Sequence, residues 1–292
     1  MGVRRAETAA MAAAESAAKA AAKAVAKAPA VSRVYTLGPL IHNPRVLADL
    51  KKRGVVEYPE ELPVTNQSSP INTEGCSFII CAHGIHPRIE NDLRGRGARI
   101  IDATCPRVKA SQLKAESLSL AGYCLFLAGE AHHAEIAGIL GYAAGFCEVV
   151  GSGGEAESAA KKLHKADKNA KAALIGQTTI SEEEYAVIGE AIKKYFPVLE
   201  IIKTICSATK DRQQALRDLL SKVDAVLVAG GKDSANTRRL LAIAAESGKP
   251  CALIESAGEI PAVFKTFGTV GLCAGASTPD IVIDEIEQGL LH

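Results

Sequence analysis

The chain has 292 residues, enough for two or three compact domains with their own hydrophobic cores. Hydrophobic residues make up 48% and charged residues 23%, values that are ordinary for a soluble globular protein. The formal net charge of +1 gives no support for a nucleic-acid or membrane-surface partner. Eight cysteines without the dense spacing of a small secreted scaffold predict reduced thiols in a cytoplasmic protein.

The first predicted element is an N-terminal helix. Residues 9–28 form an alanine-lysine tract of high helix propensity, and Pro29 ends it. Two arginines precede the tract, as they would in an organellar targeting peptide, but Glu7 and Glu15 argue against such a peptide. We therefore expect a plain helix.

Beyond this helix, short apolar strands alternate with helical segments, the pattern of α/β units with parallel sheets. The strands end in polar, glycine-bearing turns that open into helices, and two sets of three strands have matching turns. The first set lies at 78–84, 124–129 and 225–231, and the second at 34–37 (leading to His42 and Asn43), 173–179 and 270–277.

Two further strands end in a cysteine and continue into a helix with a lysine at the same offset. They are Ile100–Cys105, followed by Lys109, and Ile201–Cys206, followed by Lys210. The step of about a hundred residues is the period of the whole pattern. We therefore predict an α/β fold of three similar domains with parallel sheets, in a pseudo-threefold arrangement around a central site. The expected domains are 1–104, 105–205 and 206–292.

Cys105 and Cys206 are candidate metal ligands. A cysteine where a strand ends and a helix begins lies near free backbone N–H groups and the positive end of the helix dipole, which favours the thiolate. Thiolates are the ligands of iron–sulfur clusters. Three such cysteines, one per domain, would hold three irons of a four-iron cluster and leave the fourth open. On the residues alone, two buried thiols that only pack remain the alternative.

The other six cysteines fall into two groups. Cys81 and Cys273 lie at strand ends that face the expected centre, so we expect them to be spare thiols near the site. The remaining four have no counterpart in the repeat and are predicted to pack as small hydrophobic residues: Cys76, Cys124, Cys147 and Cys251.

Small hydrogen-bonding residues open two helices near the C-terminus. Ser234 and Asn236 lie at one helix start, and Ser277 at another. Helix N-termini bind phosphate through free N–H groups, although each of these residues, taken alone, is more often a simple cap. The chain has no Walker-type loop and no dinucleotide glycine fingerprint, so nucleotide binding is not favoured.

Histidines occupy three of the strand-end turns. His42, His83 and His133 are three of only seven in the chain, which predicts a site that donates hydrogen bonds to an anion. Glu135 is the carboxylate in these turns best placed for proton transfer. A solvated glutamate in the first turn of a helix is the alternative.

Taken together, these motifs identify a resemblance to the LytB/IspH family, the 4-hydroxy-3-methylbut-2-enyl diphosphate reductases of the methylerythritol phosphate route to isoprenoids. The resemblance runs from Gly2 to the C-terminal helix. It rests on segments 41–43, 82–84, 102–106, 133–135, 177–179, 205–209, 234–236 and 274–277.

The resemblance implies three α/β domains around a central [4Fe–4S] cluster held by three cysteines. It implies reductive dehydroxylation of the allylic diphosphate substrate to isopentenyl and dimethylallyl diphosphate, with a ferredoxin or flavodoxin as electron donor. The implied cluster ligands are Cys105 and Cys206, and the implied catalytic residues are Glu135, Thr178 and His133. The implied substrate-binding residues are His42, His83, His133, Thr178, Ser234, Asn236 and Ser277.

Two departures from the family pattern stand out. Ala235 replaces a second serine, so one hydrogen bond to the diphosphate is expected to be lost. The family's first cluster cysteine lies in a Gly-Phe-Cys-x-Gly-Val motif, and Met1–Ala6 matches the residues after that cysteine. We therefore expect the first domain to lack its N-terminal strand and the first cysteine, most simply through a misassigned start codon. This chain is then expected to be inactive or impaired, unless Cys81 or Cys273 substitutes as a ligand.

Two other functions compete with this interpretation. The first is a non-catalytic diphosphate-binding protein that has lost its cluster, but such a protein would not need Glu135 and Thr178. The second is a related three-domain, three-cysteine enzyme such as quinolinate synthase. That enzyme fits the architecture but not the segments 133–135 and 177–179.

Overall fold

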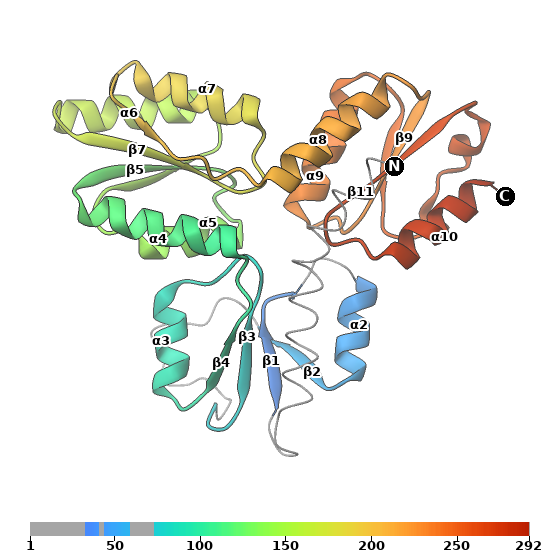
Figure 1. Ribbon diagram of the computed structural model, residues 1–292, viewed down its shortest axis with the longest axis horizontal. Coiled ribbons are helices and arrows are strands. Elements are labelled where there is room, and N and C mark those ends of the chain that lie inside the picture. Colours follow the sequence, from blue (N-terminus) through green and yellow to red (C-terminus); the bar gives the residue numbers. More distant parts are fainter. Residues whose placement is uncertain (1–32, 41–43, 59–72, 292) are drawn as a thin grey trace. The chain divides into compact units, whose positions relative to one another are not determined.

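Three parallel β-sheets follow one another along the chain in the computed structural model (Figure 1). The structure describes residues 33–40, 44–58 and 73–291, so the predicted helix at 9–28 and His42 lie outside it. The described residues divide into two compact units: 33–40, 53–58 and 73–206 form one, and 44–52 and 207–291 form the other. Within the described ranges, none of the helices has the length and apolar character needed to span a bilayer.

The first sheet is small and built around aromatic packing. Its strands are parallel in the order β2-β1-β3-β4, and the Phe78 ring stacks on Tyr35 with centroids 5.0 Å apart. The sequence predicts a gap in this sheet, but the structure gives it four strands, as many as the second sheet has. Its elements are β1 (Val34–Leu37), β2 (Val55–Tyr58), β3 (Ser77–Ile80), α3 (Pro87–Gly95) and β4 (Arg99–Asp102); α2 (Pro44–Lys52) belongs to the other unit.

The second sheet is covered by helices on both faces (Figure 1). Alternate residues of each strand point to opposite faces, so Phe126 and Leu174 pack under α6 and α7, whereas Leu127 and Ile175 pack under α4 and α5. Burial on both faces explains why these strands read as continuous apolar runs. The order is β6-β5-β7-β8, built from α4 (Pro106–Leu120), β5 (Tyr123–Ala128), α5 (Ala134–Tyr142), β6 (Cys147–Val150), α6 (Gly153–Ala166), β7 (Lys171–Gly176), α7 (Glu182–Lys193) and β8 (Glu200–Ile201).

The third sheet has three strands among the residues that the structure describes, in the order β10-β9-β11. Leu216 and Leu240 cover one face from α8 and α9, and Ile286 covers the other from α10. The elements are α8 (Ser207–Leu220), β9 (Ala225–Ala229), α9 (Ala235–Glu246), β10 (Cys251–Ile254), β11 (Val270–Ala274) and α10 (Asp280–Leu291), with short 3-10 helices at Ala257–Glu259 and Ala262–Thr266.

The predicted repeat is visible in the hydrogen bonds of the backbone. Each sheet has a switch point between two neighbouring strands, from which the next strands of the chain are added on opposite sides: β1 and β3, β5 and β7, and β9 and β11. The residue after the first strand of each pair is a glycine that donates to the neighbouring edge strand, at 2.8, 3.1 and 2.9 Å. These glycines are Gly38, Gly129 and Gly230. The predicted fold class, α/β with three parallel sheets of like construction, is confirmed.

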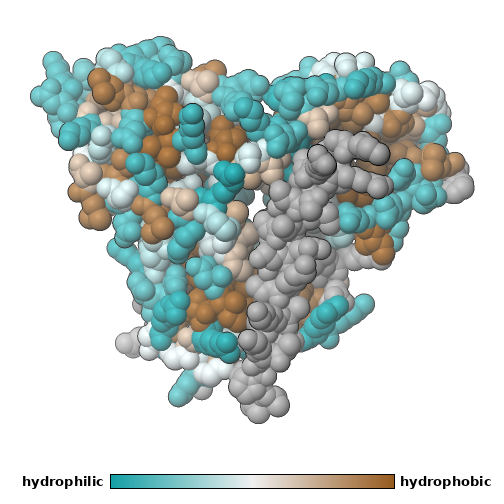
Figure 2. Space-filling model, in the orientation of Figure 1, coloured by the Kyte–Doolittle hydropathy of each residue, from teal (hydrophilic) through white to brown (hydrophobic). Residues whose placement is uncertain are grey.

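The outer surface mixes polar and apolar side chains. Figure 2 shows small hydrophobic groups interspersed with hydrophilic residues. Among the described residues, the most exposed large apolar side chains are Val198 at 92%, in the loop between α7 and β8, and Leu120 at 77%, at the end of α4. Scattered residues of this kind are normal on folded proteins and need no ligand to explain them.

Candidate active site

The turns after β5 and β7 lie at the same edge of the second sheet. Ala128, the last residue of β5, is in register with Gly176, the last residue of β7. The turn after β5 leads to His133 and α5, and the turn after β7 carries Gln177, Thr178 and Thr179. Because this is a switch point, the two turns diverge and leave room for side chains between them.

Glu135 and Thr178 form a buried pair across this switch point. The backbone N–H of Thr178 donates to Glu135 Oε1 at 2.7 Å, and the Thr178 hydroxyl donates to Oε2 at 2.9 Å. Glu135 is only 3% exposed, and burial raises the pKa of its carboxyl from 4.5 to about 7, although the hydrogen bonds from Thr178 oppose the rise. Glu135 is therefore not the solvated first-turn residue that the sequence also allowed. A carboxyl with this pKa can give or take a proton near neutral pH.

Two of the predicted histidines lie together. His133 caps α5, and its Nδ1 accepts a hydrogen bond from the Glu135 N–H at 3.1 Å. In the neutral ring the proton then sits on Nε2, which leaves that nitrogen as the donor. The ring of His83, in the turn after β3, lies edge-on to the His133 ring with centroids 6.2 Å apart. The structure thus brings a donor pair close to the Glu135 turn.

Cys105 and Cys206 occupy matched backbone positions. Each comes directly before a helix, with Pro106 at the first position of α4 and Ser207 at the first position of α8. The N–H of Cys105 donates to the carbonyl of Ala82 at 2.8 Å, and that of Cys206 donates to the carbonyl of Thr178 at 3.0 Å. Ala82 and Thr178 are each the second residue after their strand. The two cysteines therefore match in hydrogen bonding as well as in spacing.

The surroundings of the cysteines separate these two from the rest. Cys105 and Cys206 are partly exposed and belong to none of the apolar clusters within the described ranges. The predicted packing cysteines do belong to such clusters, and burial raises the pKa of three of them, that of Cys147 to about 12. These packing residues are Cys76, Cys124, Cys147 and Cys251.

The two spare thiols are poorly suited to replace a ligand. Cys81 is fully buried and its Sγ donates to the carbonyl of Leu37 at 2.9 Å. Burial raises the pKa of Cys273 to about 11, and its side chain packs against the core of the third sheet. Among the described residues, no three His, Cys, Asp or Glu side chains converge on a metal-binding position. The donor chemistry of Cys105 and Cys206 fits two ligands of a thiolate-bound cluster.

The third sheet presents a second set of predicted site residues. Ser234 caps α9, as His133 caps α5, and accepts from the N–H of Thr237 at 3.4 Å. Asn236 is 7% exposed, and both polar atoms of its side chain are buried without a hydrogen-bond partner among the described residues. Ser277 is half-buried in the turn before α10. An unpartnered buried amide is costly, so Asn236 is poised to bind a ligand.

Gln177 is a buried polar residue of this site, and the sequence placed it only within a motif. It is fully buried, its Oε1 accepts from the N–H of Glu130 at 3.0 Å, and its Nε2 donates to Thr179 Oγ1 at 3.0 Å. The side chain therefore ties the turn that precedes His133 to the turn that carries Thr178. A polar residue at the end of an otherwise apolar strand was the available signal.

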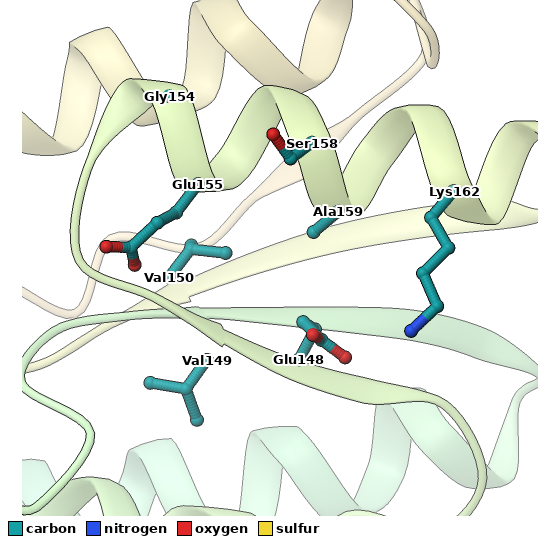
Figure 3. A pocket seen from close by; sticks show the side chains of 8 residues that line it. All are labelled: Glu148, Val149, Val150, Gly154, Glu155, Ser158, Ala159 and Lys162. Carbon is teal, nitrogen blue, oxygen red and sulfur yellow. The ribbon is translucent and has the colours of Figure 1, made fainter.

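A separate pocket of about 430 Å³ lies between β6 and α6 (Figure 3). Glu148 and Lys162 point into it, and Glu155 at its rim accepts a hydrogen bond from the N–H of Gly151 at 2.8 Å. None of the predicted site residues lines this pocket. The chemistry of the second sheet is therefore at the strand-end turns.

Comparisons with known proteins agree with this geometry. The model of the LytB protein family matches residues 3–291. The 4-hydroxy-3-methylbut-2-enyl diphosphate reductase of Treponema denticola is 45% identical over 89% of this chain and 88% of its own length. The reductase of the same name from Desulfovibrio desulfuricans is 38% identical over 99% of both chains.

Solved structures give the same result. A structure of (E)-4-hydroxy-3-methylbut-2-enyl diphosphate reductase superposes with a TM-score of 0.66 at 35% identity, covering 96% of this chain and 94% of the other. The reductase of Plasmodium falciparum superposes with a TM-score of 0.84 at 25% identity, covering 94% and 83%. The chain therefore belongs to the LytB family, whose members include these diphosphate reductases.

Proposed function

We propose that the protein reduces (E)-4-hydroxy-3-methylbut-2-enyl diphosphate to isopentenyl and dimethylallyl diphosphate, the last step of the methylerythritol phosphate pathway. The names of its relatives support this substrate. The observation that carries the proposal is the buried Glu135–Thr178 pair, because a protein that only bound a diphosphate would not need a neutral-pH proton donor.

Glu135 acts as the proton donor in this proposal. Replacing the allylic hydroxyl with hydrogen takes up two electrons and two protons and releases water. One proton must reach the leaving oxygen, and the carboxyl of Glu135 is in its donating form in about half of the molecules at a pH near its pKa of about 7. The Thr178 hydroxyl, which already touches Glu135, has lone pairs that can accept a hydrogen bond from the substrate hydroxyl and orient it.

The cofactor is a [4Fe–4S] cluster held by Cys105 and Cys206 together with a third thiolate, as the resemblance to the family implies. When bound, the cluster would relay the two electrons of the donor one at a time and would offer an iron without a protein ligand to the substrate. Both cysteines lie directly before a helix, where free backbone N–H groups of the first turn can donate hydrogen bonds to sulfur.

The residues that bind the diphosphate are proposed from the resemblance to the family and from the donors that each of them offers. His133 and His83 offer ring N–H groups, Ser234 and Ser277 offer hydroxyl groups, and Asn236 offers an amide. His42 is proposed on the resemblance alone. Oxygens of a diphosphate would satisfy the unpartnered donor of Asn236, which gives binding energy at that position.

Several finer points complete the proposal. The electron donor is a ferredoxin or flavodoxin, and the protein works in the cytoplasm, where its eight cysteines stay reduced. The three domains span 1–104, 105–205 and 206–292, and each contains one of the three sheets. The predicted impairment of this chain would appear as incomplete iron loading.

The test is the Glu135→Gln variant, reconstituted anaerobically with iron and sulfide and assayed with a chemical reductant. We expect turnover to fall by about a hundredfold or more, while iron content and substrate affinity stay unchanged. Glu116→Gln, which changes an exposed glutamate of α4, is the matched control. Turnover in Glu135→Gln that matches the control would refute the proton-donor role. Substrate binding without turnover in the unmutated protein would instead support the non-catalytic diphosphate-binding protein.

A further inference from the structure

The segments that carry the two cysteines are held to their sheets in different ways. Before Cys105, β4 pairs with β3 over all four of its residues, and the Thr104 N–H then donates to Asp102 Oδ1 at 2.9 Å. Before Cys206, β8 has only two residues, Glu200–Ile201, paired with β7. The strand pairing therefore continues to Asp102, three residues before Cys105, but ends at Ile201, five residues before Cys206.

Side chains replace the missing ladder next to Cys206. The Tyr185 hydroxyl, from α7, lies 2.8 Å from the carbonyl of Leu174 in β7 and 2.8 Å from the carbonyl of Ile202. Its single proton is shared between these two acceptors and joins β7 to the segment beyond β8. Thr204 adds a second tie, because its Oγ1 accepts from the N–H of Gly176 at 2.9 Å.

Both ties are shielded from water and tightly packed. Tyr185 and Thr204 are each 7% exposed. A Cβ at Gly176 would lie 2.8 Å from Tyr185 Cε2 and 3.1 Å from Thr204 Oγ1, so glycine is required for this close approach. Burial also raises the pKa of Tyr185, so that its hydroxyl keeps the proton that it donates.

We propose that Tyr185 and Thr204 form a side-chain clamp that positions Cys206 for cluster binding. The inference rests on the proposed function in one respect, namely that Cys206 is a cluster ligand. The clamp holds the segment 202–205 against β7, so that the N–H of Cys206 reaches the carbonyl of Thr178. Because Thr178 also holds Glu135, the same clamp keeps the cysteine in register with the proton donor. Tyr185 and Thr204 are positioning residues and touch no reacting atom.

The first test is Tyr185→Phe in the full chain without a cluster. The variant should fold, because the carbonyl of Leu174 still accepts from the N–H of Ile202 and that of Ile202 still accepts from the N–H of Thr204. We expect faster hydrogen exchange at the Cys206 amide and faster alkylation of its thiol by iodoacetamide. The expected factor is about fivefold, which corresponds to loss of one hydrogen bond of ~1 kcal/mol.

Two controls show whether the effect of Tyr185→Phe is confined to the surroundings of Cys206. The Cys105 amide and thiol of the same molecule should keep their rates. Tyr195→Phe removes a hydroxyl from another tyrosine of the same unit. That hydroxyl has no hydrogen bond to any residue that the structure describes, so the variant should leave Cys206 unchanged. If exchange and alkylation in Tyr185→Phe become equally faster at Cys105 and Cys206, the unit has loosened as a whole and the clamp is refuted. Unchanged rates at Cys206 would also refute it.

The second test uses Thr204→Val and its rescue by Thr204→Ser, which restores the hydroxyl. After reconstitution, we expect iron to leave Thr204→Val about tenfold faster than the unmutated protein in the presence of a chelator, and Thr204→Ser to restore the rate. Failure of Thr204→Ser to slow the release would overturn the role of the hydroxyl. If no variant binds iron, the proposed cofactor fails, whereas the exchange and alkylation rates still decide on the clamp.

Discussion

The switch points of the second and third sheets have the same backbone arrangement but carry different side chains. His133 and Ser234 cap equivalent helices, and Glu135 and Asn236 follow them at the same offset. In the second sheet Glu135 accepts two hydrogen bonds from Thr178. In the third sheet the residue equivalent to Thr178 is Ala276, and the side chain of Asn236 has no hydrogen-bond partner among the described residues. The repeat therefore supplies one backbone geometry, and single side chains distinguish the proposed proton-transfer site from the proposed anion-binding site.

The largest expected effect concerns the cost of burying Glu135. Its pKa is raised in the folded protein, so the folded state binds the proton more tightly than the unfolded state. Stability should then be highest below about pH 4.5 for this group and fall by about 3 kcal/mol as the pH rises through 7. Glu135→Gln should not show this loss. Urea unfolding of both proteins at several pH values measures it, and parallel curves would contradict the assignment.

The next effect comes from making the second switch point resemble the third. Thr178→Ala removes one of the two hydrogen bonds that lower the pKa of Glu135, so that pKa should rise further. We expect turnover to drop by about thirtyfold and its upper pH limit to move to higher pH. Thr178→Ser keeps the hydroxyl and serves as the control. If the pH profile of kcat does not move in Thr178→Ala, then Thr178 does not influence the pKa of the group that controls turnover.

A smaller effect is expected at the third switch point. Asn236→Ala should weaken substrate binding by about tenfold, because one hydrogen bond to the charged diphosphate is lost. Stability should not fall, because the side chain has no hydrogen-bond partner within the described part of the chain. Binding titrations and thermal melts check both statements, with the exposed Asn169→Ala as control. A destabilised variant with normal affinity would make Asn236 a structural residue.

The smallest effect is expected at the spare thiol of the first sheet. Cys81→Ser keeps a donor for the carbonyl of Leu37, so stability should change by about 1 kcal/mol or less. Iron uptake should be unchanged, because Cys81 is buried within its own sheet. Iron content after reconstitution provides the measurement. Loss of iron in this variant would identify Cys81 as a ligand after all.

The sequence by itself determined the strands, their polar turns and the repeat. Apolar runs that end in glycine-bearing turns are local patterns, and they identified β1, β3, β5, β7, β9 and β11 with their site residues. The matched cysteines were equally visible because their spacing is a property of the chain. The prediction of a gap in the first sheet was wrong, since strand order depends on pairing between distant segments.

Only the tertiary structure decided how these residues act. The burial of Glu135 and its bonds to Thr178 join positions that are far apart in the sequence, and so do the bridge made by Gln177 and the clamp made by Tyr185. The sequence could not show that β8 ends early, because Ile201 and Ile202 have the same strand propensity. Local propensity thus set the elements, whereas packing between distant segments set the pKa of Glu135 and the support of Cys206.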